Sequence, residues 1–386
     1  MNWETDTFIT KKLSSDTQQS SLNSMDINTA SEQSQKNETP SLLLQAKRAI
    51  VDALNQKAWF IRLTNKEYWH SNIFFIPVSL YVIYLAMRAR SPLFFSAANP
   101  SIPTGGMIGE NKADISRWIP PKYRPKNTVI SPLMFVSEIS KSLDTAGLEF
   151  PLIIKPTVGA RGFLVKKIHT KQEILTHIEQ NPTLFLIEEY IDYPVEAAVL
   201  YWRNPETNES GISSVTVKEF LHVIGNGQSS IKELLMRNQR GVLQIPRLLE
   251  EQADLMASIP ELGRKIIVEP IGNHCRGTKF LNFNHLITPD MVAAFDKIQA
   301  DLPDCYLFRL DLKTPSVSDL QKGKNIKILE INGVGSDPAH IFDPTFPLWS
   351  MYAAYFSLWR KIFEISTAVH RRGVPYMRWA EFRLFL

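Results

Sequence analysis

Residues 308–340, FRLDLKTPSVSDLQKGKNIKILEINGVGSDPAH, contain two short runs in which apolar and polar residues alternate. The first run places Arg309 and Asp311 two positions apart, and the second places Glu330 and Asn332 two positions apart. Side chains at positions i and i+2 of a strand point to the same face of a sheet. We therefore expect two strands that direct an arginine, two acids and an amide to one side of a buried sheet.

These residue types suggest a metal site that serves phosphate chemistry. Mg²⁺ takes oxygen ligands and is usually shared between protein carboxylates and substrate phosphates. Asp311, Glu330 and Asn332 would supply carboxylate and amide oxygens, and Arg309 on the same face would neutralise a phosphoryl group during transfer. The simpler alternative is an Arg–Asp ion pair beside two unrelated polar residues at a sheet edge.

The composition limits the class of protein. The chain has 386 residues, 44% of them hydrophobic, and a formal net charge of +4 from 43 basic and 39 acidic residues. Its length suits two or three domains of about 100–200 residues. The charge balance gives little reason to expect nucleic acid as a partner. With two cysteines, Cys275 and Cys305, no zinc spacing and no secretory signal, we expect a cytoplasmic location.

Strand and helix patterns alternate along most of the chain, which predicts an α+β or mixed α/β fold rather than a helical bundle. Residues 1–40 are rich in Ser, Thr, Gln and Asn, and we expect a disordered polar tail there. We expect strands within 151–168, at 184–191, as one long strand at 211–225, and within 306–313 and 326–335. We expect helices at 39–59, 131–147, 170–181, 229–239 and 288–302.

Two apolar segments flank the central part of the chain. We expect residues 41–109 to form a helical hydrophobic region, in which only Arg88 and Arg90 are charged between His70 and Glu110. Its uncharged run is shorter than the roughly 20 residues of a membrane span, and it contains Pro77. Residues 346–386 carry aromatic residues at helical spacing, beside basic ones. Each segment is either a helix packed on the core or a face held at a membrane or partner.

A glycine loop follows an apolar strand in IIKPTVGARGF, residues 153–163. Lys155 ends the strand, and Gly159, Arg161 and Gly162 lie in the loop. Small residues let backbone N–H groups approach phosphate oxygens, and a lysine adds positive charge. The alternative is an ordinary turn between two strands.

A second apolar strand, in LFLIEEYIDYPVE (184–196), ends in two acids. The backbone at such a strand end can hydrogen-bond an adenine, and Glu196 would reach the ribose hydroxyls. The alternative is a strand end at which Glu188 and Glu189 are simply solvated.

Taken together and in this order, FPLIIKP, VGARG, IEEYI, FRLDL and LEINGVGS resemble the motifs of the ATP-grasp superfamily, over about residues 110–345. The resemblance implies an ATP-grasp fold with two α+β lobes that grip ATP. The nucleotide lobe would comprise residues 110–195, and the substrate and metal lobe residues 196–345.

The same resemblance implies a role for each matched residue. Phosphates would be bound by Lys112, Lys155, Gly159, Arg161 and Gly162, adenine would be bordered by Glu188, Glu189, Tyr190 and Ile191, and ribose would be bound by Glu196. Asp311, Glu330 and Asn332 would hold two Mg²⁺ ions, with Mn²⁺ as the alternative metal, and Arg309 would stabilise an acyl phosphate.

Two further segments suggest residues for the reaction. VTVKEFLHVIGNGQSSIKELL (215–235) resembles the central part of cyanophycin synthetase and glutathione synthetase-like ligases, which implies that Lys218 is a second phosphate lysine rather than a surface lysine. GNHCRGTKF (272–280) contains His274, Arg276 and Lys279, and indicates either anion or substrate binding or a basic turn. We expect the substrate pocket to combine this segment with 332–340 and part of the N-terminal region.

The implied function is an ATP-dependent ligase of the D-alanine–D-alanine ligase type. It would activate a carboxylate as an acyl phosphate for attack by an amine or another nucleophile, releasing ADP and phosphate. GVGSDPAH after Asn332 departs from the form of D-alanine ligases, so D-alanine itself is not implied. The alternative is a non-catalytic nucleotide-binding scaffold. The expected partners are small carboxylate and amine substrates, with the inner face of the cytoplasmic membrane or a second copy of the chain as a contact surface.

Overall fold

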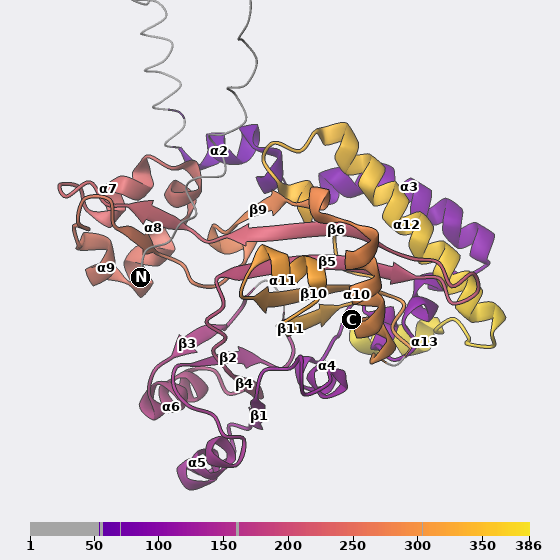
Figure 1. Ribbon diagram of the computed structural model, residues 1–386, viewed down its shortest axis with the longest axis horizontal. Helices are drawn as coiled ribbons and strands as arrows, with labels where there is room; N and C mark the ends of the chain where they lie inside the picture. The colour runs from indigo at the N-terminus through magenta and orange to yellow at the C-terminus, as the bar shows by residue number, and fades with distance from the viewer. Residues whose placement is uncertain (1–53, 55–56, 70, 160–161, 303) are drawn as a thin grey trace, which may run out of the picture. The chain divides into compact units, whose positions relative to one another are not determined.

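Five antiparallel strands form the larger sheet of the computed structural model, which describes residues 54, 57–69, 71–159, 162–302 and 304–386 (Figure 1). The strand order is β11–β10–β5–β6–β9. Their bounds are β5 Val195–Arg203, β6 Ser210–Glu219, β9 Lys279–Asn282, β10 Leu307–Thr314 and β11 Lys327–Asn332. The two strands expected within 308–340 are therefore present, and they are neighbours. All described residues belong to one compact unit.

Two smaller sheets contain the other described strands. One has the order β1–β4–β2–β3 and is covered by two helices, which share a buried cluster with it. Its elements are β1 Asn127–Ile130, α5 Val136–Thr145, β2 Leu152–Pro156, β3 Lys166–Ile168, α6 Lys171–Gln180 and β4 Phe185–Glu189. The other pairs β7 (His222–Ile224) with β8 (Lys265–Ile267) beside α7 (Ile231–Met236), α8 (Gln239–Glu251) and α9 (Ala253–Ala257). The expected α+β fold class is confirmed.

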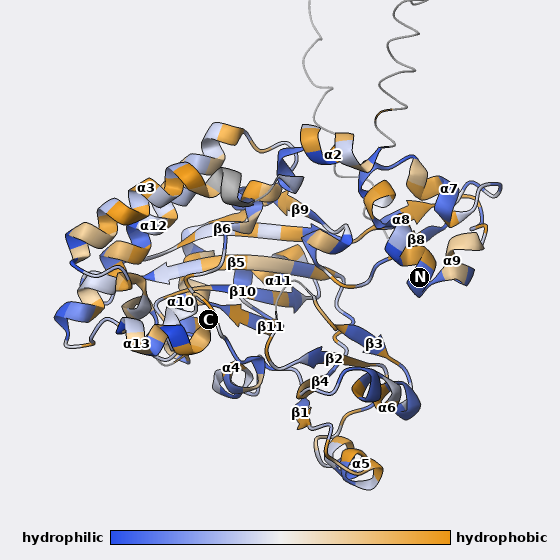
Figure 2. Ribbon diagram, turned by 180° about the vertical axis from the view of Figure 1, so that it is seen from behind, coloured by the Kyte–Doolittle hydropathy of each residue, from blue (hydrophilic) through white to orange (hydrophobic). Residues whose placement is uncertain are grey.

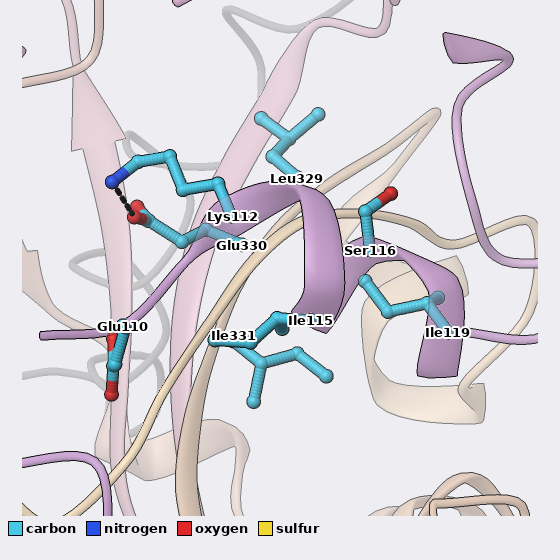
Figure 3. Close-up of a pocket in the computed structure, with 8 residues that line it drawn as sticks. All are labelled: Glu110, Lys112, Ile115, Ser116, Ile119, Leu329, Glu330 and Ile331. Carbon is cyan, nitrogen blue, oxygen red and sulfur yellow. Dashed lines mark ion pairs between the residues drawn. The ribbon is translucent and has the colours of Figure 1, made fainter. Parts of the chain in front are cut away.

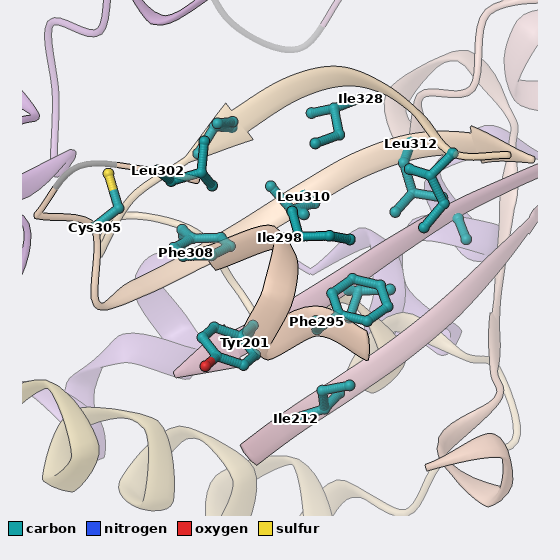
Figure 4. Packing of buried hydrophobic residues seen from close by; sticks show 14 of the residues in the cluster. Tyr201, Ile212, Phe295, Ile298, Leu302, Cys305, Phe308, Leu310, Leu312 and Ile328 are labelled. Atoms are coloured by element: carbon teal, nitrogen blue, oxygen red, sulfur yellow. The ribbon is translucent and has the colours of Figure 1, made fainter. Parts of the chain in front are cut away.

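Alternation along β10 divides its side chains between two faces of the large sheet. Phe308, Leu310 and Leu312 are fully buried, in a cluster with side chains of α10 (Pro289–Ala300) and α11 (Val317–Lys322) (Figure 4). The intervening Arg309 and Asp311 must then point to the opposite face, because successive side chains of a strand alternate. Burial of the apolar set thus determines which face receives the charges.

The opposite face of the sheet is covered at one end by helices. Leu200 and Leu307 pack there with η2 (Phe94–Ala98), α3 (Ser71–Ala89) and the long α12 (Leu348–Arg371). The rings of Trp359 and Phe363 on α12 lie 6.2 and 5.9 Å from that of Phe94. The interpretation of the C-terminal aromatic residues as core-packing side chains is confirmed for these two.

Helix α3 has one buried and one exposed apolar face. Val78 and Leu85 are buried in clusters that include α12 residues. Ile76, Leu80, Ile83 and Met87 are instead 56–68% exposed, and α3 shows hydrophobic residues along its length in Figure 2. The segment therefore packs on the core through one face only. Among the described residues, no helix has the length and apolar character needed to cross a membrane.

The prediction of one long strand at 211–225 is wrong. The chain leaves the large sheet after Glu219, because the Leu221 carbonyl accepts hydrogen bonds from the backbone N–H groups of Val268 and Glu269 and β7 then pairs with β8. Strands β1, β5, β8 and β9 and helix α8 were not predicted. Within β5, Ala197–Tyr201 are all buried, so the strand shows no alternation of apolar and polar residues.

The expectations for the N-terminus fall largely outside the described residues. The polar tail 1–40 lies there, as does the helix predicted at 39–59 except near its end, where α2 (Ala58–Thr64) begins. The remaining described elements are η1 Lys66–Tyr68, η3 Pro103–Gly105, α4 Lys112–Trp118, η4 His274–Arg276, η5 Asn284–Leu286, η6 Ala339–Phe342, α13 Trp379–Phe382 and η7 Arg383–Phe385. The domain limits given above stay a prediction.

Asn99 joins the N-terminal segment to the start of β10, and its replacement by alanine should destabilise the protein. Its amide donates to the carbonyls of Gly105 and Leu307 at 2.9 and 2.7 Å, and its oxygen accepts from the N–H groups of Tyr306 and Leu307, both at 2.9 Å. Asn99 is fully buried, and each backbone group left unpaired costs about 1–3 kcal/mol. We expect Asn99→Ala to lower the free energy of unfolding by roughly 3 kcal/mol or more in urea titrations.

Asn204→Ala is the matched control for this change. The Asn204 side chain accepts only local hydrogen bonds, from Glu206 and Thr207 in an exposed turn. We expect a loss of about 1 kcal/mol or less from it. Equal losses in the two variants would show that Asn99 does not hold the two segments together.

Candidate active site

The predicted site residues lie around one cleft of about 1200 Å³. It is lined by Lys112, Lys155, Gly159, Gly162, Glu188, Glu189, Tyr190, Ile191, Glu196, Lys218, Arg276, Arg309, Asp311, Glu330 and Asn332. Arg161 is not among the residues that the structure describes. The cleft also includes Arg62, Glu67, Tyr68 and Trp69 from the N-terminal region. Segments far apart in the sequence therefore meet here, as expected for the substrate pocket.

The register of β10 and β11 brings the four residues of the two motifs together. Arg309 is opposite Asn332, and Asp311 is opposite Glu330. Asp311 Oδ2 accepts hydrogen bonds from Arg309 Nη2 at 3.0 Å and from Asn332 Nδ2 at 3.1 Å. The Arg–Asp ion pair of the simpler alternative is thus real, but it lies inside the cleft and not at an isolated sheet edge.

Asp311 is held in its charged form. Burial by itself would raise the pKa of this carboxyl, but Arg309 and Lys218 outweigh burial and keep the pKa below its usual value. Lys218 Nζ lies 3.5 Å from Asp311 Oδ1 and 2.9 Å from Glu196 Oε1. Although burial favours a neutral lysine, these two carboxylates raise the pKa of Lys218. Lys218 is therefore a buried, charged residue of the cleft and not a surface lysine.

The donor set at the two strands fits a divalent cation that prefers oxygen. Asn332 uses its Nδ2 to contact Asp311, which leaves the amide oxygen as an additional ligand atom beside the carboxylates of Asp311 and Glu330. Two carboxylates and an amide oxygen suit Mg²⁺, which takes few protein ligands and keeps places for water and phosphate. In the described part of the chain no group of three or more His, Cys, Asp or Glu is arranged for metal binding.

Lys155 and Glu188 form a buried pair between β2 and β4. Lys155 Nζ lies 2.7 Å from Glu188 Oε2 and donates to the carbonyl of Leu329 at 3.0 Å. Burial raises the pKa of Glu188, and Lys155 opposes this rise. Because a buried charge without its partner is costly, each side chain positions the other.

Lys112 connects the start of α4 with two other parts of the cleft. Its Nζ lies 3.1 Å from Glu330 Oε1, as the dashed line in Figure 3 marks, and donates to the carbonyl of Gly159 in the glycine loop. The backbone N–H of Lys112 donates to the carbonyl of Thr157 at 2.7 Å. The α4 helix begins here because Asn111 caps it, accepting from the N–H groups of Ala113 and Asp114. The cap thus positions Lys112 beside both the glycine loop and Glu330, which is one of the predicted metal ligands.

Sequence reasoning missed Lys313, which continues the alternation of Arg309 and Asp311. Its Nζ donates to the Ile191 carbonyl at 3.0 Å and lies 3.9 Å from Glu196 Oε2. It also lies 5.1 Å from the centre of the Tyr190 ring. The i+2 rule applied once more after Asp311 would have found it.

Glu110 is a second missed residue. Its Oε1 accepts from the backbone N–H of Gly333 at 2.8 Å, directly after Asn332. Burial, assisted by the charge of Glu330, raises the pKa of Glu110 to about 7. No local sequence pattern distinguishes this residue, because its surroundings are formed by the end of β11.

Arg276 lies in the cleft wall within an acidic surrounding. Its Nε donates to Glu269 Oε2 at 2.8 Å, and its Nη2 lies 3.4 Å from Glu251 Oε2. Arg247 contacts the same two carboxylates, at 2.8 and 2.6 Å. These pairs fix the guanidinium groups in the cleft wall, and a role of Arg276 in anion or substrate binding stays a prediction.

Glu110 should make the stability of the protein depend on pH in the absence of metal and nucleotide. Because the folded state binds this proton more tightly than the unfolded state, the free energy of unfolding should fall as pH rises from 4.5 to about 7 and then level off. Glu110→Gln removes this loss. The test measures the free energy of unfolding by urea titration with chelator at pH 5 and pH 8. Between these pH values, this free energy should fall by roughly 3 kcal/mol more in the parent than in the variant.

Glu179→Gln, an exposed change on α6, is the control and should leave the pH dependence unchanged. If the curves of Glu110→Gln and the parent stay parallel between pH 5 and 8, Glu110 is not a buried acid of raised pKa.

Comparison with known proteins finds remote similarity to several solved structures. No family model and no curated protein matches the chain. Similar solved structures include the VanG D-Ala:D-Ser ligase from Enterococcus faecalis, at 14% identity and TM-score 0.38, over 67% of this chain and 61% of that one. A D-alanine–D-alanine ligase from Bacillus anthracis has 14% identity and TM-score 0.38, over 69% of each chain. A bifunctional glutathione synthetase from Pasteurella multocida has 13% identity and TM-score 0.33, over 64% of this chain and 36% of that one.

Proposed function

We propose that the protein is an ATP-dependent ligase of the ATP-grasp type, which joins a carboxylate to an amine or a similar nucleophile. The observation that carries this proposal is the set of four cation–carboxylate pairs in one cleft: Lys155–Glu188, Lys112–Glu330, Lys218–Glu196 and Arg309–Asp311. A purely structural role would not require four such pairs side by side, since each costs desolvation.

The pairs suit a site that exchanges partners when a polyphosphate binds. The phosphates of ATP would accept from Lys112 and Lys155, which now contact Glu330 and Glu188. Asp311, Glu330 and Asn332 would hold Mg²⁺. When bound, the metal would offset negative charge on the phosphate oxygens. The glycine loop beside Lys112, and the Ile191 carbonyl beside Lys313, would border the nucleotide.

The reaction would proceed in two displacements. An oxygen of the substrate carboxylate attacks the γ-phosphorus, the bond to the β-phosphate oxygen breaks, and ADP leaves. The amine then attacks the acyl carbon, phosphate leaves, and the nitrogen loses a proton. Arg309 and Lys218 are positioned to neutralise charge on the transferred group, since both adjoin Asp311. Such catalysis is mainly positioning and charge neutralisation.

A nucleotide-binding scaffold without catalysis is the alternative. It would need the nucleotide residues but not Arg309, whose Nη2 pairs with the carboxylate of Asp311 at 3.0 Å. The presence of this guanidinium beside a proposed metal ligand therefore favours the ligase.

The first test of the ligase is the nucleotide product. With Mg²⁺, ATP and pooled carboxylic acids and amines, we expect ADP and phosphate, resolved by chromatography. AMP with pyrophosphate would indicate adenylation and overturn the acyl-phosphate route. Tight ATP binding without phosphate release from any pool would favour the scaffold.

Substitutions in the same assay separate binding from transfer. Asp311→Asn and Glu330→Gln each remove the negative charge of a proposed metal ligand with little change of shape. Each substitution should abolish turnover. Arg309→Ala should lower kcat more than ATP affinity, because its partner is charge that develops during transfer. Equal loss of ATP binding in all three would make Arg309 only the ion-pair partner of Asp311.

We further propose that the exposed face of α3 attaches the protein to an anionic membrane surface. Ile76, Leu80, Ile83 and Met87 form this face, Arg88 and Arg90 follow at its end, and no acid occurs in the helix. Apolar side chains bordered by arginines suit the headgroup region of anionic lipid.

Flotation with anionic liposomes at low and high salt tests the attachment. We expect binding at low salt that Leu80→Asp reduces. Leu262→Asp, a change at a still more exposed leucine in another part of the fold, should not reduce it. A parent protein that stays soluble under both conditions rules the membrane out. Loss of a dimer in Leu80→Asp, seen by sedimentation, would then identify the face as a contact between two copies.

A further inference from the structure

The cleft extends from its charged centre to a cluster of aromatic rings that the proposed reaction does not use. His274 lies between the rings of Tyr68, Phe280 and Phe342, at centroid distances of 5.7, 5.5 and 5.5 Å. Phe280 and Phe342 are 6.4 Å apart. All four side chains line the cleft and none is fully buried, so the ring surfaces border the open space.

The cluster is held in place by residues around it. Glu67 Oε2 accepts from His274 Nε2 at 3.2 Å and also pairs with Arg240. Arg240 in turn donates to the carbonyl of Thr278 at 3.1 Å. Phe342 is fixed through its neighbour Asp343, which accepts from the backbone N–H of Asn282 on β9. The rings thus form a prepared surface and not a set of loose side chains.

This surface begins directly beside the proposed position of phosphoryl transfer. Phe280 is opposite Lys218 in the β6–β9 register, and Lys218 Nζ lies 5.7 Å from the centre of the Phe280 ring. Lys218 also lies 3.5 Å from Asp311. A carboxylate held by Lys218 and Arg309 would therefore place the body of its molecule on Phe280.

The size of the cleft allows a second ligand beside a nucleotide. Pockets for one small ligand are typically about 300–1,000 Å³, and this cleft has about 1200 Å³. Flat aromatic ligands gain from offset or edge-to-face contacts with aromatic side chains. A small polar acid would leave the rings exposed to water.

We propose that the acid activated by this enzyme carries an aromatic or similarly flat apolar body next to its carboxylate, which packs on Phe280, Phe342 and His274. The assignment rests on the proposed ligase function and names the substrate class of that site. The N-terminal segment contributes to specificity, since Tyr68 and Glu67 complete the surface.

The test uses the full chain with Mg²⁺ and a non-hydrolysable ATP analogue at saturation. Binding of cinnamate, acetate and cinnamyl alcohol is measured by calorimetry. We expect cinnamate to bind at least about tenfold more tightly than acetate, because its ring leaves water, and more tightly than the alcohol, which lacks the carboxylate. Equal affinity for cinnamate and acetate overturns the assignment.

Variants locate the binding surface. Phe342→Leu keeps an apolar side chain without a ring and should weaken cinnamate about three- to tenfold, the range expected for loss of an aromatic pair. It should leave acetate and the ATP analogue unchanged. Phe135→Ala, an exposed aromatic residue before α5, is the control and should change nothing. Unchanged cinnamate affinity in Phe342→Leu contradicts the proposal.

The outcomes separate this inference from the function on which it rests. If the ATP analogue does not bind the parent protein, the ligase proposal fails. If the analogue binds normally and cinnamate competes with it, the rings belong to the nucleotide, and only the substrate assignment fails. If both bind together and Phe342→Leu affects cinnamate alone, the assignment is supported.

Discussion

Most of the site depends on the alternation of side chains along β10. Phe308, Leu310 and Leu312 are buried on one face, and a shift of the strand by one residue would bring Arg309 and Asp311 into that apolar cluster. An unpaired charge there would cost several kcal/mol, far more than any local contact could return. The apolar set therefore fixes the orientation of the charged set, and the neighbouring strands supply partners for each charge.

The cations of the charged face are each paired with a carboxylate. Lys155, Lys112, Lys218 and Arg309 each have a carboxylate within 3.1 Å. These carboxylates offset the four positive charges that the cleft brings together. In the proposed function, the same carboxylates would bind a metal once phosphates take the lysines as partners. New charge-assisted hydrogen bonds would then offset the cost of separating the pairs.

The N-terminal segment is a structural part of the cleft and not an appendage. Gly105 and Gly106 approach Gly333 so closely that a Cβ on Gly106 would lie 2.5 Å from the Gly333 Cα. The N–H groups of Val334 and Gly335 donate to the carbonyls of Gly105 and Gly106, at 3.1 and 2.9 Å. Only glycine permits this approach, which joins the chain before Glu110 to the loop after Asn332. Glu67 and Tyr68 then reach the aromatic end of the same cleft.

The sequence by itself determined the local pieces. Alternation in FRLDL and LEIN predicted two strands with a shared polar face, and helical spacing predicted α12, because these periods are properties of neighbouring residues. Only the tertiary structure decided what depends on distant partners. Strand β5 is buried on both faces and therefore shows no alternation of apolar and polar residues. The break between β6 and β7 arises from the hydrogen bonds that the N–H groups of Val268 and Glu269 donate to the Leu221 carbonyl. Glu110 and the rings around His274 likewise gain their surroundings from segments more than 60 residues apart, which no local pattern encodes.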